Sequence, residues 1–262
     1  MRSTDHTPAT ARPRHRLPGV AALVAGLLAL TACTVAGHES TAALTAAPTS
    51  TATQKLSRSD ALLFSGATGT TPPEALAILD KLPVKGRAPK TGYARNQFGD
   101  NWTDDVDVAG GHNGCDTRND ILGRDLTDPA FKPDTHDCVV LSGTLNDPYT
   151  GKTIEFVRGP GTSNAVQIDH VVALADAWQK GAQQLTPRER ANLANDPRNL
   201  LAVDGPTNQQ KGAGDAATWL PPNKDFRCTY VTKQIEVKSA YSLWVTQAEK
   251  DAMTRVLNAC TP

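Results

Sequence analysis

The stretch "QIDHVVALADAW" (residues 167–178) contains the feature on which the prediction of fold and function depends. The residues before and at its start have the pattern of an extended strand, and its second half has the pattern of a helix. Asp169 and His170 are adjacent where one pattern changes to the other. Two interpretations are open: a catalytic pair, or an aspartate that caps a helix starting near Val171 next to an ordinary polar histidine.

Two downstream stretches decide between these interpretations. "NDPRNLLAV" places Asn199 at the start of a short apolar strand, and "NQQKGAGD" places Asn208 and Lys211 about one helical turn apart. Taken singly, the asparagines would be turn or cap residues and the lysine a solvated side chain. Their joint order (strand, Asp-His, connection, Asn on a strand, helix with Asn and Lys) favours a functional site.

This order resembles the HNH endonuclease motif of the ββα-metal fold, in the variant whose last position is Asn rather than His. Further stretches are similar to those of secreted, bacterial members of the HNH family that also forms the C-terminal domain of GmrSD-type restriction endonucleases: "GYARNQFG", "GCDTRNDIL", "LSGTLNDPYTG" and "WLPP". The resemblance covers nearly all of residues 74–260, with the core motif at 165–215. It implies an α+β domain built around a ββα-metal core.

The resemblance also implies a role for each residue of the motif. His170 would be the general base, because a histidine of near-neutral pKa can accept a proton from water. Asp169 and Asn208 would bind one Mg²⁺ or Mn²⁺ ion through oxygen atoms. Asn199 would hold the loop and the base histidine by hydrogen bonds, and Lys211 would pair with a phosphate.

The stretch "GCDTRND" (114–120) is a second candidate region. Arg118 could stabilise transition-state charge or hold a flanking phosphate. The alternative is that Asp116 caps a helix and Arg118 pairs with a surface acid. Asp176 is expected on a helix surface. The four tryptophans are expected in the core: Trp102, Trp178, Trp219 and Trp244.

The N-terminus has the pattern of a secretory signal peptide (1–33). Three arginines between positions 12 and 16 precede the apolar run "GVAALVAGLLAL", which is too short for a membrane span of about 20 residues. "LTAC" resembles a lipobox, in which Cys33 would carry a lipid and anchor the protein to a membrane; the alternative is a plain signal with an incidental cysteine. Residues 34–58 are rich in Thr, Ala and Ser and are predicted to be a flexible tether before a folded domain at 59–262.

The charge balance restricts the class of partner. The chain has 27 basic and 27 acidic residues, and the first 33 residues contain four Arg and one Asp, so the remainder has a net charge of −3. A mildly acidic domain is not a generic nucleic-acid binder with a broad basic face. A polyanionic substrate would therefore need a local basic groove or a bound metal.

The cysteines indicate disulfides. Four follow Cys33, and in an exported protein an even number suggests pairing. Of three possible pairings we favour the sequence-local one, Cys115–Cys138 with Cys228–Cys260. The alternative is a zinc site that uses His112 and His136 with the first two cysteines. Many HNH domains carry CxxC pairs for a structural zinc, and this chain has none, so disulfides would supply the bracing.

The remaining stretches predict a single α+β domain. Helices are expected at 72–82, 116–126, 170–182, 186–196, 205–212 and 246–260, two of them with capping boxes that start at Thr186 and Thr246. Strands are expected on both sides of the turn "NDPYTG", at 163–169, at 199–203 and at 228–238.

The predicted function is a monomeric, exported, metal-dependent endonuclease that hydrolyses DNA, with RNA as a further candidate substrate, and has little sequence preference. It would act outside the cytoplasm, as a surface lipoprotein or secreted. Two alternatives stay open: a surface-anchored, non-catalytic binding or cell-wall lipoprotein of the same fold, and a metal-dependent hydrolase of another phosphoester.

Overall fold

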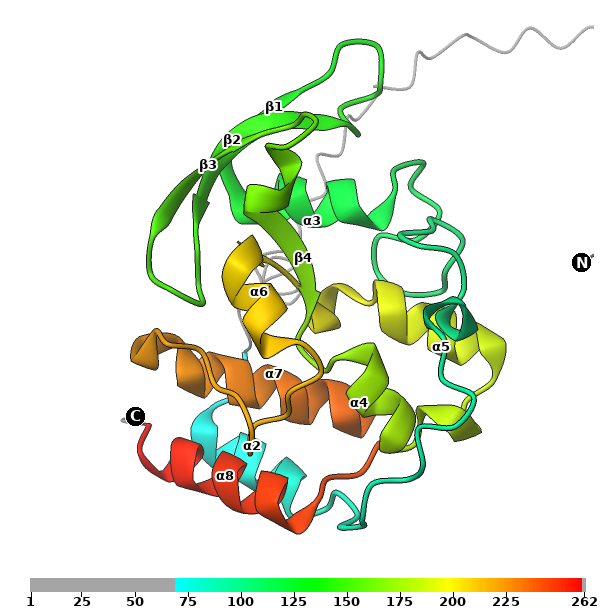
Figure 1. Cartoon of the computed structure of the whole chain (residues 1–262), viewed down its shortest axis with the longest axis vertical. Coiled ribbons are helices and arrows are strands. Elements are labelled where there is room, and N and C mark those ends of the chain that lie inside the picture. The colour runs from blue at the N-terminus through cyan, green and yellow to red at the C-terminus, as the bar shows by residue number, and fades with distance from the viewer. Residues whose placement is uncertain (1–68, 261–262) are drawn as a thin grey trace, which may run out of the picture. The chain divides into compact units, whose positions relative to one another are not determined.

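The computed structural model describes residues 69–260 (Figure 1), so the predicted signal peptide and the whole of the predicted tether lie outside the described residues. The α-helices are α2 (Pro72–Leu79), α3 (Thr117–Asp125), α4 (Leu174–Gln179), α5 (Pro187–Asn195), α6 (Gly205–Lys211), α7 (Arg227–Ala240) and α8 (Gln247–Asn258). The strands are β1 (Leu126–Phe131), β2 (Val140–Asn146), β3 (Thr153–Val157), β4 (Val166–His170) and β5 (Leu200–Asp204). The domain is α+β, as predicted. None of the helices in the described part is long and apolar enough to cross a membrane.

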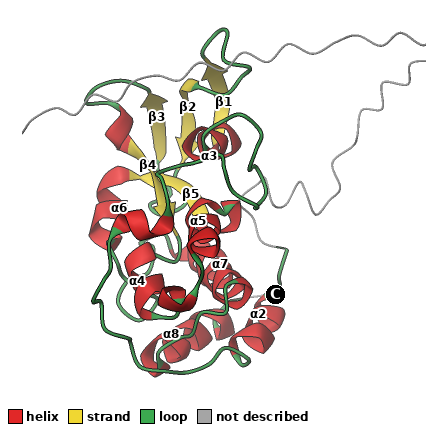
Figure 2. Cartoon of the chain, turned by 90° about the vertical axis from the view of Figure 1, so that its right-hand side faces the viewer, coloured by secondary structure: helices red, strands yellow, loops and turns green. Residues whose placement is uncertain are grey.

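The strands β4 and β5 form an antiparallel pair with α6 packed on both of them (Figure 2). His170 pairs with Leu200 at one end of the ladder and Val166 pairs with Asp204 at the other. Asp204 ends β5 and also starts α6, because its carboxylate accepts a hydrogen bond from the backbone N–H of Thr207. The helix therefore begins directly after the strand. This places Asp169 and His170 beside α6, although about 40 residues separate them in sequence.

The strands β1, β2 and β3 form a second antiparallel sheet, on which α3 packs (Figure 2). β2 and β3 confirm the predicted strands, and Asp147 stabilises the turn between them by accepting hydrogen bonds from the backbone N–H groups of Tyr149 and Thr150. β1 was not predicted. Its sequence "LTDPAF" contains a proline, which argues against a strand, and its register with β2 shifts around that proline.

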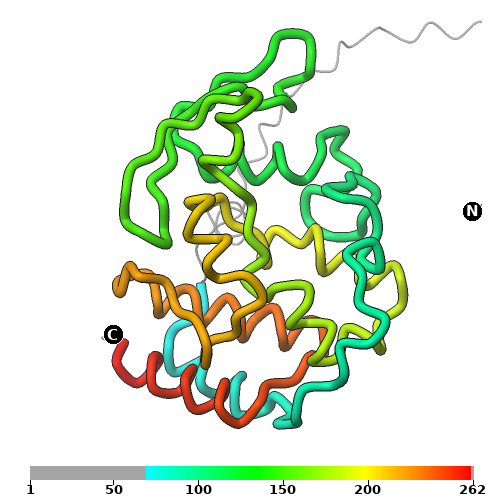
Figure 3. The backbone as a smooth tube through the Cα atoms, viewed as in Figure 1, coloured from blue at the N-terminus to red at the C-terminus, as the bar shows by residue number. Residues whose placement is uncertain are grey.

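The prediction of a strand at 228–238 was wrong, because these residues belong to the helix α7. The stretch is rich in β-branched residues, which favour strands by propensity. In the structure it is a helix that packs against α2 and α8 (Figure 3), and it is buried around most of its circumference, including Tyr230, Val231 and Ile235. Packing against two other helices outweighs the local preference.

The two disulfides have the predicted pairing, Cys115–Cys138 and Cys228–Cys260. The first joins the start of α3 to the loop before β2. The second joins the first turn of α7 to the residue two positions after α8. The zinc alternative is therefore excluded, because both of its cysteines are oxidised.

A buried cluster of charged side chains joins α4, α7, α8 and the loop after α6. Lys180 is fully buried, and its ammonium lies 2.8 Å from Asp176, 2.8 Å from Asp215 and 2.6 Å from Glu249. Lys238 is also fully buried and lies 3.1 Å from Glu249. The expectation that Asp176 lies on a helix surface was wrong, since it is buried in this cluster.

Lys233 is a buried cation whose removal should stabilise the fold. Burial lowers the pKa of Lys233 from 10.5 to about 8, with the charge of Arg124 as the second cause. The unfolded chain binds more protons than the folded one between these values, so this lysine makes stability rise as the pH rises from about 8 to 10.5. We expect Lys233→Met to raise Tm at pH 7. We expect the difference in Tm between this variant and the wild type to become smaller above pH 8. Thermal unfolding from pH 7 to 10, with the exposed Lys81→Met as the control, tests this; an equal or lower Tm at pH 7 contradicts it.

Candidate active site

A cavity of about 570 Å³ lies beside the end of β4, and it brings together residues from α3, β4 and α6. Four of the six residues predicted from the sequence line it: Arg118, Asp169, His170 and Asn208. The other two, Asn199 and Lys211, are buried behind its wall and bond to the residues next to it.

His170 is held in one orientation. Its Nε2 lies 2.9 Å from the carbonyl oxygen of Ala194, which can only accept, so Nε2 carries the proton of the neutral ring. Nδ1 then has a free lone pair, with no hydrogen-bond partner among the described residues. Trp102 stacks on the imidazole with ring centroids 5.5 Å apart and planes 12° apart. The ring therefore has one tautomer, in which Nδ1 is the acceptor.

The pKa of His170 is lowered to about 3, first because the ring is buried and second because of the charge of Arg95. The hydrogen bond to Ala194 acts in the opposite direction. The imidazole is therefore neutral at physiological pH, the form that a general base requires.

Asn199 holds the loop that follows His170. Its amide oxygen accepts a hydrogen bond from the backbone N–H of Val172 at 2.8 Å, and its amide nitrogen donates to the carbonyl of Leu193 at 3.1 Å. Leu193 precedes Ala194, whose carbonyl holds the His170 ring. One buried side chain thus connects the end of β4 to the end of α5. The hydrogen bonds of Asn199 and His170 therefore meet at the end of α5.

Asp169 lies among buried partners. Tyr149 donates its hydroxyl to one carboxylate oxygen at 2.5 Å, and Lys211 donates its ammonium to the other at 2.9 Å. Burial raises the pKa of Asp169, and the charge of Lys211 acts against that rise. Asp169 does not cap a helix, since α4 begins five residues later, at Leu174.

Lys211 was expected to pair with a phosphate, but in the structure it lies in the interior. Its side chain is fully buried, and its ammonium donates to Asp169 and, at 2.7 Å, to the carbonyl oxygen of His170. These bonds fix the end of β4 against α6. The pattern of one helical turn between Asn208 and Lys211 could not distinguish a buried lysine from an exposed one.

Asn208 completes the set of oxygen donors. Its amide nitrogen donates to Gln167 at 3.0 Å, and its amide oxygen accepts no hydrogen bond from residues 69–260; the residue lines the cavity. Asp169 and Asn208 are hard oxygen donors, which suit Mg²⁺ or Mn²⁺ better than zinc. Within residues 69–260, no group of three or more His, Cys, Asp or Glu side chains is arranged to hold a metal. An ion bound here would have to take its other ligands from water and substrate, since Tyr149 and Lys211 already bond to the two carboxylate oxygens of Asp169.

Arg118 lines the cavity from α3. Its guanidinium donates to the carbonyl oxygen of Val166 at 3.2 Å, and no ion pair with a surface acid forms within the described residues. Asp116 caps α3 through the backbone N–H of Asn119, which is one half of the alternative interpretation.

The sequence did not single out three contacts at this site. Tyr149 was quoted only as part of "LSGTLNDPYTG", and Arg95 only as part of "GYARNQFG". Trp102 was expected in the core but is only half-buried and covers His170, whereas Trp178 and Trp244 are buried as expected. No local sequence pattern predicts these contacts, because each contact joins segments that are far apart in sequence.

Residues 116–256 match the sequence profile of the GmrSD restriction endonucleases, C-terminal domain. The chain belongs to this family. All six predicted site residues lie within the matched range, whereas Arg95 and Trp102 precede it.

An uncharacterized secreted protein from the fungus Arthroderma benhamiae is similar to this member of the GmrSD C-terminal-domain family. It is 38% identical over 188 residues, which cover 71% of this chain and 84% of the fungal protein. No solved structure matches the chain. A bacterial source therefore remains a prediction.

Proposed function

We propose that the protein is a metal-dependent HNH endonuclease whose general base is His170. The observation that carries the proposal is the orientation of this ring: Ala194 binds the protonated Nε2, and Nδ1 is free beside a cavity that Asp169 and Asn208 also line. The antiparallel pair β4–β5 with α6 would be the ββα-metal core. The substrate would be DNA, with RNA as a further candidate, and sequence preference would be low.

His170 would accept a proton from the attacking water at Nδ1. The Ala194 carbonyl would stabilise the resulting imidazolium through Nε2. A phosphate in the cavity would offset the charge of Arg95 and so raise the low pKa of the histidine, which makes it a stronger base when substrate is bound. Arg118 would contact a phosphate oxygen, and Asn199 would keep the loop in place.

Asp169 and Asn208 would hold one Mg²⁺ or Mn²⁺ ion. Such an ion neutralises charge on the scissile phosphate and stabilises the leaving oxygen. Lys211 already pairs with Asp169, so phosphate oxygens would have to supply further negative charge and ligands. We assign Lys211 a positioning role, because its ammonium joins Asp169 to the backbone of His170.

We propose that the protein acts outside the cytoplasm as a monomer. Two disulfides and the secreted relative support export, since disulfides persist in oxidising compartments. A lipid on Cys33 would anchor it to a membrane; that residue lies outside the described part of the chain.

Nicking of supercoiled plasmid tests the proposed function. The full-length chain, expressed with export so that the disulfides form, should nick plasmid with Mg²⁺ or Mn²⁺ and not with EDTA. Asn208→Ala should lower the rate at a fixed metal concentration by about 10- to 100-fold, because the ion loses one of two protein ligands. Asn258→Ala, on the exposed side of α8, is the matched control.

Two results would contradict this function. Nicking that persists in EDTA would mean that the reaction needs no divalent ion. A folded protein that cleaves no nucleic acid with any metal would favour the non-catalytic binding lipoprotein, or a hydrolase of another phosphoester.

A further inference from the structure

The cavity has an excess of positive charge that the HNH motif does not account for. Lys90 and Arg95 line it together with Arg118, and none of the three forms an ion pair with a carboxylate among the described residues. The one acidic residue in the lining is Asp169, which Lys211 already neutralises. In a chain whose folded part is mildly acidic, this is a local basic groove that attracts polyanions.

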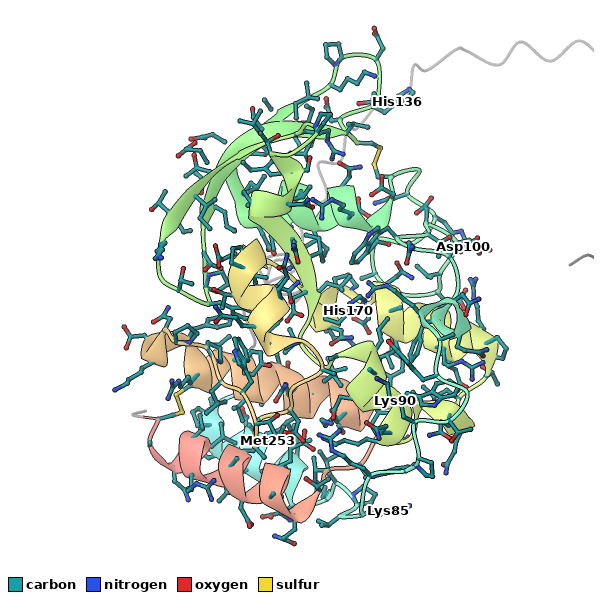
Figure 4. All side chains as sticks on the ribbon, in the orientation of Figure 1. Lys85, Lys90, Asp100, His136, His170 and Met253 are labelled. Atoms are coloured by element: carbon teal, nitrogen blue, oxygen red, sulfur yellow. A yellow bond between two sulfur atoms is a disulfide. The ribbon has the colours of Figure 1, made fainter. Side chains whose placement is uncertain are left out.

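Lys90 and Arg95 belong to the 83–102 segment, which is held rigidly against the rest of the domain. Tyr93 packs edge-on against Trp178, with ring centroids 6.1 Å apart. Arg190 donates to the carbonyl of Gln97 at 2.7 Å. Figure 4 labels Lys90, which belongs to this segment, and His170, and both residues line the cavity. The two cations are therefore presented by a fixed backbone.

The cations lie at both ends of β4. Arg118 bonds to the carbonyl of Val166, the first residue of the strand, whereas Arg95 lines a smaller hollow together with His170, the last residue of the strand. Four residue steps of about 3.3 Å make these ends about 13 Å apart. Successive phosphates of one strand advance by about 3.4 Å along a duplex, so the two ends of β4 are farther apart than two neighbouring phosphates.

We propose that Lys90 and Arg95 form a second phosphate-binding arm, opposite Arg118, so that the site takes an internal phosphodiester of a polynucleotide with phosphates on both sides. This inference rests on the proposed function and narrows it. Mononucleotides and isolated phosphodiesters would use only part of the site. The two residues precede the range that matches the family profile, so the family's motif does not assign them.

The salt dependence of DNA binding tests the arm. Binding of a fluorescent duplex oligonucleotide is measured by anisotropy in the His170→Ala background, which prevents turnover. Each lost phosphate contact should reduce the slope of log K against log salt by about 0.9, and so weaken binding about fivefold at 0.15 M salt. We expect this for Lys90→Gln and for Arg95→Gln. Lys85→Gln is the matched control, because Lys85 is exposed on the same segment but lies over Trp244, away from the cavity.

The length of the substrate gives a second measurement. In the background with His170 intact, kcat/KM should rise from a dinucleotide to a hexanucleotide as flanking phosphates reach the arm. The rise should be smaller in Lys90→Gln and in Arg95→Gln than in Lys85→Gln.

The outcomes of these experiments distinguish a failure of the proposed phosphate-binding arm from a failure of the proposed nuclease function. If the wild type nicks plasmid but both arm variants keep the salt slope of the His170→Ala parent and the wild-type gain in kcat/KM with substrate length, the proposed arm is wrong and the proposed nuclease function is unaffected. If the wild type neither nicks nor binds nucleic acid, the proposed function fails and the arm fails with it. A reduced slope in both variants, with Lys85→Gln unchanged, supports the arm.

Discussion

Replacing His170 by alanine is expected to lower the rate of plasmid nicking by about 10²- to 10⁴-fold, the usual contribution of a general base. No other group of the cavity lining can replace it: Asp169 bonds to Tyr149 and Lys211, and the remaining ionisable residues in the lining, Lys90, Arg95, Tyr93 and Arg118, are cations or a weakly acidic phenol. The rate should be measured at saturating metal, with single turnover, so that product release does not mask the effect.

His112→Ala is the matched control for this experiment, because His112 is 61% exposed and does not line the cavity. His170→Ala should still bind an oligonucleotide, since the cationic side chains remain. Equal nicking rates for His170→Ala and the wild type would assign the reaction to another residue or to a contaminating nuclease.

Replacing Lys180 by methionine is expected to reduce the free energy of unfolding by about 3–5 kcal/mol, because it leaves buried carboxylates without their shared cation. Three acids contact this fully buried ammonium, and only Lys238 and the partly exposed Arg87 remain to balance them. Domains of this kind have about 5–15 kcal/mol in total, so the loss would be a large fraction. Urea unfolding at pH 7 measures it.

The pH dependence of this deficit provides a further check. Asp215 is one of the three acids, and Lys180 lowers the pKa of its carboxyl to about 2 by a hydrogen bond and by its charge, against the effect of burial. That contribution to stability is present above about pH 4 in the wild type and is lost as the pH falls towards 2. Without Lys180 the carboxyls can take up protons, so the deficit should narrow as the pH falls towards 4.

Lys250→Met is the control for Lys180→Met. Its ion pair with Asp80 is 3.1 Å long, but Asp80 is 76% exposed, so the loss should be below about 1 kcal/mol. If the two variants lose the same free energy, the buried cluster is not the source of stability that its geometry indicates.

Local patterns in the sequence predicted those parts of the fold that depend on neighbouring residues. The capping boxes at Thr186 and Thr246 start α5 and α8, because both partners of each box lie within four residues. Both disulfide pairs formed between cysteines close in sequence. Where propensity and packing disagreed, as in α7, local reasoning failed, since burial on most sides is not encoded by a few adjacent residues.

In the candidate site, too, some features were predicted from the sequence and others depend on tertiary packing. The order of Asp169, His170, Asn199 and Asn208 resembles the HNH motif, and that resemblance predicted a strand pair followed by a helix, which β4, β5 and α6 form. Whether Lys211 faces the cavity or the interior depends on which side of α6 packs against β4, and the spacing of two residues leaves that undecided.

The sequence by itself determined the chemistry available at this site: one histidine, one carboxylate and two amides in the order of a known motif, on a domain closed by disulfides. The tertiary structure alone decided how that chemistry is presented. The stacking of Trp102 on His170, the burial of Lys211 against Asp169 and the approach of Lys90 and Arg95 join segments separated by tens of residues. Such contacts depend on how whole elements pack, so no window of the sequence contains the information that specifies them.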